Sequence, residues 1–195
     1  RQKEALLQDL ETAAPLKLTP LPWRGGRLVL LHQVQLFYGT EPVCRPLDLE
    51  LCPGDRVAVV GANGSGKSTL LKLLQGQNIQ REGLFRCSPE LKVSYLPQDC
   101  SGLSGFPEDL AEQWGIDKTK FFTLLKKLDL TPDTWQRPME GYSLGQKKKV
   151  MLAASLCENA HLYLWDEPLN YIDLWSRMQI EQLILESCPT IVFVE

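Results

Sequence analysis

The stretch DRVAVVGANGSGKSTLLKLLQG, residues 55–76, joins an apolar β-branched run to a glycine-rich loop and then to a helical pattern. The run before the glycines predicts a buried strand. The nine residues GANGSGKST, 61–69, fit the pattern G-x-x-x-x-G-K-[ST] at every fixed position. The following helix is expected to start near Lys67 and to close at Gly76. A strand, a glycine loop and a helix in this order predict a βα unit of an α/β fold.

The chemistry of this loop is that of a phosphate cradle. Glycines allow the backbone to turn so that its N–H groups approach phosphate oxygens, and the helix N-terminus adds a positive dipole end. Lys67 supplies a mobile cation for the β- and γ-phosphates, and the Ser68 hydroxyl is a ligand that Mg²⁺ accepts. The predicted phosphate-binding residues are Gly61, Asn63, Gly64, Ser65, Gly66, Lys67, Ser68 and Thr69.

A second pair of functional candidates follows the apolar run LYLW in LYLWDEPLNYID, residues 162–173. Asp166 ends this predicted strand, where an unpaired buried carboxylate would be costly unless a metal ion offsets its burial. We therefore expect Asp166 to hold Mg²⁺ beside the phosphates. Glu167 points to another side and is expected to polarise the attacking water as a general base, a role worth about 10²–10⁴ in rate.

The remaining segments complete an α/β pattern with a largely parallel sheet. RLVLLHQVQLF (27–37), LDLEL (47–51), GLFRC (83–87), KVSYLPQ (92–98) and TIVFV (190–194) read as further strands, and LWSRMQIEQLILES (174–187) reads as a helix. Residues 101–158 are expected to be mainly helical. Within them, Asp117 is the expected N-cap, and Phe121, Leu124, Leu125 and Leu128 form an apolar stripe that fits core packing.

Composition limits the classes of function. The 195 residues are 44% hydrophobic and 23% charged, which excludes a disordered or collagen-like chain. The net charge of −3 gives no overall basic field, so charge does not argue for nucleic-acid binding, although a local basic patch remains possible. No apolar run is long enough to span a bilayer, which predicts a soluble, cytoplasmic protein without direct membrane insertion. Six scattered cysteines and two histidines favour reduced thiols over a metal site.

With these motifs in this order, residues 27–195 resemble the ATP-binding cassette (ABC) ATPases. The segment YSLGQ, residues 142–146, is similar to the family signature LSGGQ, YLPQD places Gln98 as the Q-loop glutamine, and FYG places Tyr38 where an aromatic ring stacks on adenine. The resemblance implies a P-loop NTPase fold with an antiparallel β subdomain, a helical subdomain at about residues 100–158, ATP and Mg²⁺ as ligands, and ATP hydrolysis. It places Ser68, Gln98 and Asp166 at the metal, with Gln98 also at the water.

Ser143-x-x-Gln146 before a helical run is a capping box, and a capped helix start with Gly145 is an anion site. In the family, Ser143, Gly145 and Gln146 would contact the γ-phosphate held by another cassette, and Asp173 matches the D-loop aspartate. Leu144 replaces the first glycine of the usual signature and could crowd that nucleotide. The plain alternative is an ordinary helix start. For Lys147–Lys149, the sequence favours a solvated helix face over a contact with RNA phosphates.

Asn170 and Tyr171 after the acids resemble the ABC-F class, soluble proteins with two cassettes joined by a helical linker. YSLGQKKKVMLAASL and AHLYLWDEPLNYIDLWSRMQIE look like the second (C-terminal) cassette of ABC-F proteins that protect ribosomes against lincosamides, streptogramin A and pleuromutilins. The resemblance implies the ribosome, its rRNA and tRNA as partners and antibiotic resistance as the outcome. Residues 1–26 would be the end of the inter-cassette linker, and the chain would stop before the switch histidine. The alternative is the ATPase subunit of a membrane transporter.

Overall fold

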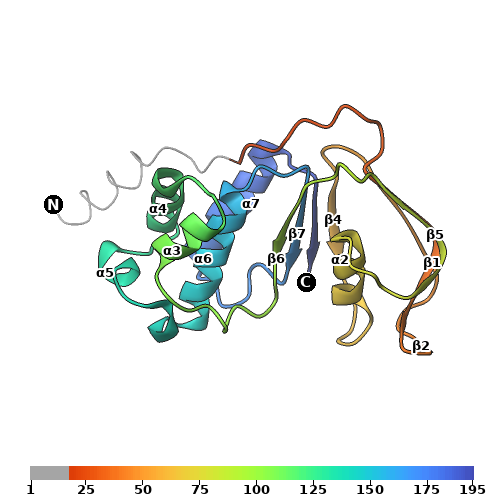
Figure 1. Ribbon diagram of the computed structural model, residues 1–195, viewed down its shortest axis with the longest axis horizontal. Helices are drawn as coiled ribbons and strands as arrows, with labels where there is room; N and C mark the ends of the chain where they lie inside the picture. Colours follow the sequence, from red (N-terminus) through yellow and green to blue (C-terminus); the bar gives the residue numbers. More distant parts are fainter. Residues whose placement is uncertain (1–17) are drawn as a thin grey trace.

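The computed structural model describes residues 18–195. The amphipathic helix end expected in residues 1–14 therefore lies outside the described part. Residues 18–28, which include the end of the expected connector, contain no helix or strand. They pass over one end of the sheets before the first strand begins (Figure 1).

A parallel sheet forms the centre of the molecule. Its order is β4 (Arg56–Val59), β8 (Ile191–Val194), β7 (Leu162–Asp166) and β6 (Val93–Leu96), and all neighbours are parallel. All five residues of β7 are buried, as the apolar run LYLW predicts. The strands run in one direction, so the carboxyl ends of β4 and β7, which carry the glycine loop and the two acids, meet at one edge.

The expectation of a buried strand before the glycine loop is wrong in one respect. The strand β4 exists, but within the described residues it pairs only with β8 and lies at the edge of the sheet. Its residues alternate between exposed and half-buried, and Val60 directly after it is 73% exposed. An apolar β-branched run is favourable on any half-covered pleated surface, so its composition does not distinguish a central strand from an edge strand.

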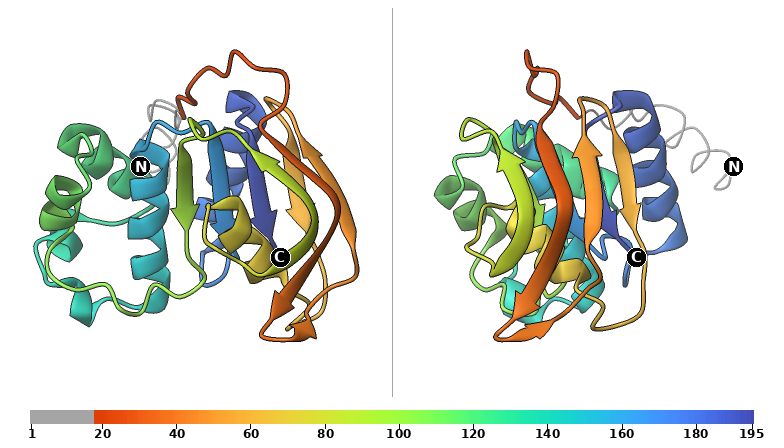
Figure 2. Two further views of the ribbon diagram at one scale, coloured as in Figure 1. Left: turned by 45° about the vertical axis from the view of Figure 1, so that its right-hand side comes forward. Right: turned by 90° about the vertical axis from the view of Figure 1, so that its right-hand side faces the viewer.

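An antiparallel sheet packs beside the parallel one. It consists of β1 (Val29–Tyr38), paired with β2 (Glu41–Pro42), β3 (Leu47–Leu51) and β5 (Arg81–Cys87). Helix α2 (Lys67–Leu74) lies between the two sheets (Figures 1 and 2). Its four leucines share one buried cluster with Leu36 of β1 and Leu164 of β7. Gly76 closes α2 with φ +89°, as its position in the sequence predicts.

Helices cover the other face of the parallel sheet (Figure 1). They are α3 (Pro107–Gln113), α4 (Lys118–Lys127), α5 (Pro132–Trp135), the 3₁₀ turn η1 (Met139–Gly141), α6 (Leu144–Cys157) and α7 (Leu174–Ser187). The predicted N-cap is confirmed, since Asp117 accepts a hydrogen bond from the Lys120 N–H at 2.6 Å. The predicted stripe Phe121, Leu124, Leu125 and Leu128 is buried in this core. Among residues 18–195, no helix is both long and apolar enough to cross a bilayer.

The solvated face expected for Lys147–Lys149 is wrong. All three lysines are buried in the first half of α6, and their ammonium groups bond to atoms of the same chain. The alternative contact with RNA phosphates does not fit these buried groups either. Helix α6 is enclosed on nearly all sides by α4, β6 and the end of β7, so its polar positions must find partners inside the fold.

Candidate functional site

The glycine loop between β4 and α2 encloses a hollow of about 310 Å³. Gly66 stands at the N-cap of α2 with φ +89°, and a Cβ built there would lie 3.1 Å from Val43 Cγ2. The loop therefore requires glycine at this position for its backbone angle and has little room for a side chain. The residues that line the hollow are Val43, Asn63, Gly64, Ser65, Gly66, Lys67, Ser68, Thr69, Gln98 and Glu167.

The lysine of this loop folds back over it. Lys67 Nζ donates to the backbone carbonyls of Gly61 at 2.6 Å and of Ala62 at 3.3 Å. These contacts keep the ammonium group at the mouth of the loop, on the side where the N–H groups of α2 are unpaired. A cation, a helix N-terminus and glycine N–H groups thus converge on one hollow, which is an arrangement suited to phosphate.

The metal candidate is the carboxylate at the end of β7. Asp166 is only 2% exposed, and its Oδ1 is a buried oxygen with no hydrogen-bond partner among the described residues. Burial raises the pKa of Asp166, while a hydrogen bond from Ser68 opposes the rise. A buried carboxylate oxygen without a partner, beside a serine hydroxyl, fits the oxygen ligands that Mg²⁺ prefers. The residues present therefore fit this ion.

Glu167, directly after β7, also lines the hollow. Its backbone has φ +48°, a left-handed conformation that is uncommon for a non-glycine residue and that turns the chain directly after β7. Asn170 Nδ2 donates to Glu167 Oε2 at 2.5 Å. Sequence reasoning used Asn170 only to identify a class and missed this contact. The sequence signal that could have predicted this contact is the spacing of three residues between Glu167 and Asn170.

Other predicted site residues lie away from the hollow. Ser143 and Gln146 form the predicted capping box of α6, with reciprocal bonds of 2.9 and 3.2 Å. Asp173 caps α7 by accepting from the Ser176 N–H at 2.9 Å. Tyr38, at the end of β1, is 82% exposed. None of these three groups is among the residues that line the hollow, so one copy of the described chain brings together only part of the predicted set.

Gly145, in the first turn of α6, touches the segment that follows the two acids. A Cβ at Gly145 would lie 2.5 Å from the backbone oxygen of Tyr171, closer than any real contact. Tyr171 itself has φ +63° and a largely exposed side chain. The start of α6 and the loop before α7 therefore fit together only with glycine at this position.

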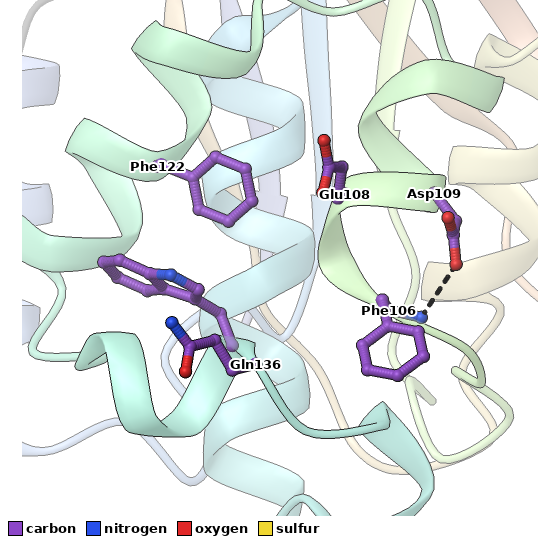
Figure 3. A pocket seen from close by; sticks show the side chains of 6 residues that line it. Phe106, Glu108, Asp109, Phe122 and Gln136 are labelled. Carbon is purple, nitrogen blue, oxygen red and sulfur yellow. Dashed lines mark hydrogen bonds between the residues drawn. The ribbon is translucent and has the colours of Figure 1, made fainter.

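A larger hollow of about 460 Å³ lies among the helices and is lined by Phe106, Glu108, Asp109, Phe122, Trp135 and Gln136 (Figure 3). Both of its carboxylates are already engaged. Glu108 pairs with Lys118 at 2.8 Å, and Asp109 accepts from the Phe106 N–H at 3.3 Å. The smaller hollow at the glycine loop combines the N–H groups of a helix start, a cation and the Glu167 carboxylate, and its Ser68 bonds to the buried Asp166. It is therefore the candidate site.

The chain is similar in sequence to known proteins. The model of the ABC transporter family matches residues 44–170, more than half of the chain. The ribosome protection protein VmlR of Bacillus subtilis (strain 168) is 31% identical over 173 residues, which cover 87% of this chain and 31% of VmlR. The zinc import ATP-binding protein ZnuC of Pseudomonas putida is 27% identical over 161 residues, 80% of this chain and 62% of ZnuC. The chain thus spans less than two thirds of either relative.

A solved ABC transporter ATP-binding protein from Pyrococcus furiosus has the same fold, with a TM-score of 0.72 at 22% identity over 86% of this chain and 90% of that protein. The predicted fold class is confirmed: a P-loop NTPase with a parallel sheet, an antiparallel sheet and a helical part. The match of the family model, supported by the likeness to VmlR, shows that the chain belongs to the ABC transporter family as an ATP-binding domain, a class of domain that hydrolyses ATP.

Proposed function

We propose that the chain is the second cassette of an ABC-F protein that acts on the ribosome in the cytoplasm and confers antibiotic resistance by ribosomal protection. One observation carries this proposal: the 31% identity to a ribosome protection protein extends over 87% of the chain. The order Glu167, Asn170, Tyr171 adds support, since the pairing of Asn170 with the glutamate gives this class-specific residue a place beside the hollow. The domain division at residue 26 and the linker before it belong to the same proposal.

In this proposal the hollow at the glycine loop receives the triphosphate of ATP. Lys67 and the loop N–H groups bind its phosphates, Thr69 adds a hydroxyl, and Tyr38 stacks on the adenine. Ser68, Gln98 and Asp166 hold Mg²⁺, which supplies charge neutralisation for phosphoryl transfer when it is bound. The unpaired Oδ1 of Asp166 is the feature that supports this metal assignment most directly.

Glu167 serves as the general base in this proposal. Its carboxylate lines the hollow, and the bond from Asn170 fixes one of its oxygens. A carboxylate held in this way orients a water molecule against a phosphate and takes up its proton. Gln98, on the loop after β6, lines the same hollow and helps to place that water.

The site is completed by a second cassette. ABC domains work as dimers or with a second cassette, and Ser143, Gly145 and Gln146 would act on the nucleotide held by the partner. Their position outside the hollow of their own chain supports this assignment. The anion site at the start of α6 is a helix N-terminus with a capping box, and the exposed Leu144 side chain lies beside it.

The alternative function is that of an energy-coupling ATPase of a membrane transporter. It is favoured by the 27% identity to ZnuC over 80% of the chain. The two proposals differ in the partner that the closed ATP form would bind, a ribosome or a permease. The gene context of the intact protein also separates them, since an upstream second cassette supports the first proposal and a neighbouring permease supports the second.

The test is co-sedimentation of the intact protein with ribosomes. We expect binding that depends on ATP, and stronger binding for Glu167→Gln, because loss of the base traps the ATP-bound form. Glu181→Gln, an exposed position on α7, is the matched control and should behave as the wild type. If Glu167→Gln sediments free of ribosomes with ATP present, the ribosomal proposal loses its support, and stimulation of turnover by a permease would favour the alternative.

A further inference from the structure

Lys148 is a buried cation that joins three separate segments of the chain. Its side chain lies in the first half of α6 and is 2% exposed. Its Nζ donates to the backbone carbonyls of Pro97 at 2.8 Å, Gln98 at 3.3 Å and Asp166 at 2.9 Å. A lysine ammonium has three N–H donors, so these three carbonyls satisfy its full capacity.

A charged group in this position is costly, and it calls for an explanation. Burial lowers the pKa of Lys148, and the nearby carboxylates of Asp166, Glu167 and Asp99 act against that shift. Burying an ammonium group is unfavourable unless hydrogen bonds and opposite charges compensate. An apolar residue would fill the space at a smaller cost, as the neighbouring Val150 and Met151 do in the same helix.

The carbonyls that Lys148 binds belong to the segments that carry the proposed catalytic machinery. The carbonyl of Gln98 belongs to the loop whose side chain lines the hollow. The carbonyl of Asp166 belongs to the last residue of β7, directly before Glu167. Helix α6 itself begins with the capping box of Ser143 and Gln146, less than two turns from Lys148.

We propose that Lys148 is a positioning residue for ATP hydrolysis, which fixes the Gln98 loop and the end of β7 against α6. This inference rests on the nucleotide site proposed above. The three bonds hold the backbone at Gln98 and directly before Glu167, the two residues outside the glycine loop whose polar side chains line the hollow. They also link this pair to the helix whose N-terminus would face the partner cassette.

The geometry separates positioning from nucleotide binding. The phosphate-binding residues 61–69 form a continuous loop between β4 and α2, and none of the bonds of Lys148 reaches it. Loss of Lys148 should therefore leave the affinity for nucleotide in place and reduce turnover. Small displacements of catalytic groups are costly in rate, with about 1 Å worth as much as 10²-fold.

The experiment compares Lys148→Met and Lys148→Gln in the intact protein. Methionine keeps the length and apolar stem but removes all three bonds, whereas the glutamine amide can restore part of them. The matched control is Lys147→Met. Lys147 is the adjacent residue and is also buried, and within residues 18–195 its ammonium group donates only to the Ser101 carbonyl, at 2.6 Å. Thermal unfolding of each variant establishes the temperature at which all are folded.

We expect Lys148→Met to lower kcat by about 10- to 100-fold while the Kd for MgATP changes less than about twofold. Lys148→Gln should lie between this variant and the wild type, and Lys147→Met should stay close to the wild type. Turnover of Lys148→Met within about twofold of the wild type overturns the proposal, and so does an equal loss in Lys147→Met or a loss of affinity that matches the loss of kcat. If Lys148→Met does not fold, the kcat of Lys148→Gln and its Kd for MgATP decide whether Lys148 is a positioning residue.

Lys67→Ala keeps the failure of this inference distinct from failure of the nucleotide site. If Lys67→Ala retains full affinity for MgATP, the assignment of the hollow fails whatever Lys148 does. If Lys67→Ala loses affinity while Lys148→Met keeps normal turnover, the site stands and the positioning role of Lys148 is refuted.

Discussion

Lys149 Nζ lies 2.6 Å from Asp173 Oδ2, so an ion pair ties the second turn of α6 to the N-cap of α7. The same carboxylate accepts hydrogen bonds from the N–H and the hydroxyl of Ser176. Partial burial raises the pKa of Asp173, but the bonds from Lys149 and Ser176 outweigh it and bring the pKa to about 2. Asp173 therefore links helices α6 and α7 within one chain.

We expect Asp173→Asn to weaken the acid dependence of stability. Because the folded pKa lies below the value of about 3.9 for an unfolded aspartate, ionised Asp173 stabilises the fold above pH 4 and loses this effect towards pH 2. Asparagine still caps the helix, so the variant loses only the charge pair. The half-exposed carboxylate keeps this loss within about 1 kcal/mol.

The measurement is the free energy of unfolding in urea at pH 5 and at pH 2.5. The difference between wild type and Asp173→Asn should be present at pH 5 and should shrink at pH 2.5. Asp133→Asn, at an exposed position in α5, provides the control. If the difference in the free energy of unfolding stays constant or grows on acidification, the ion pair is not the source of the stabilisation. Asp173→Ala should cost about 1 kcal/mol more than Asp173→Asn, since it also removes the cap.

Gly145→Ala tests the close approach between α6 and Tyr171. Alanine in a helix is normally favoured over glycine by up to about 1 kcal/mol. Here its Cβ would lie 2.5 Å from the Tyr171 carbonyl oxygen, so one of the two backbones must move. We expect destabilisation of about 1–3 kcal/mol by urea denaturation. Gly141→Ala is the control, because a Cβ there meets no atom within 4 Å, and equal stability of the two variants would contradict the packing constraint.

The sequence predicted the elements of this fold more reliably than their surroundings. The glycine loop, the capping box and the Asp117 N-cap are local patterns, each within a few residues, and all are present as expected. The edge position of β4 and the enclosure of α6 depend on which distant segments pack against them. Composition did not reveal either, since Val57 and Val59 suit an edge as well as a centre, and three consecutive lysines usually lie in solvent.

The candidate site shows the same division. The seven loop residues that line the hollow, 63–69, could be predicted from one motif, and the buried carboxylate of Asp166 from the strand before it. The roles of Lys148 and of Asn170 could not, because they depend on carbonyl and carboxylate oxygens brought near by tertiary packing. Lys148 stands in the middle of three consecutive lysines, a pattern that usually indicates an exposed helix surface, so the sequence carried no local sign of its role.

Lys67→Ala should weaken MgATP binding at least about tenfold, because the lysine supplies a charge-assisted contact of about 1.5–3 kcal/mol to phosphate. Isothermal titration calorimetry measures the affinity directly. Lys72→Ala removes an exposed lysine from the last turn of the same helix and should keep the wild-type affinity. Equal affinities for the two variants would remove the phosphate assignment of the loop.

The 195-residue chain by itself should bind MgATP as a monomer and hydrolyse it slowly, with a rate per molecule that rises with protein concentration. The reason is geometric, since Ser143, Gly145 and Gln146 do not line the hollow of their own chain, and in the proposed function they act on that of a partner. A mixing experiment isolates this dependence. Lys67→Ala and Ser143→Ala chains should each be inactive alone, because every site lacks one half.

Mixing these two chains creates pairs in which one site has a wild-type loop from the Ser143→Ala chain and a wild-type capping box from the Lys67→Ala chain. We therefore expect turnover to return to about a quarter of that of the wild-type chain at the same total concentration. About half of the pairs formed on equal mixing are mixed, and one of the two sites in a mixed pair is complete. Mixing Lys67→Ala with a Lys67→Ala, Ser143→Ala double variant should restore nothing. Turnover that is independent of concentration, from chains that sedimentation velocity shows to be monomeric, would exclude a shared site.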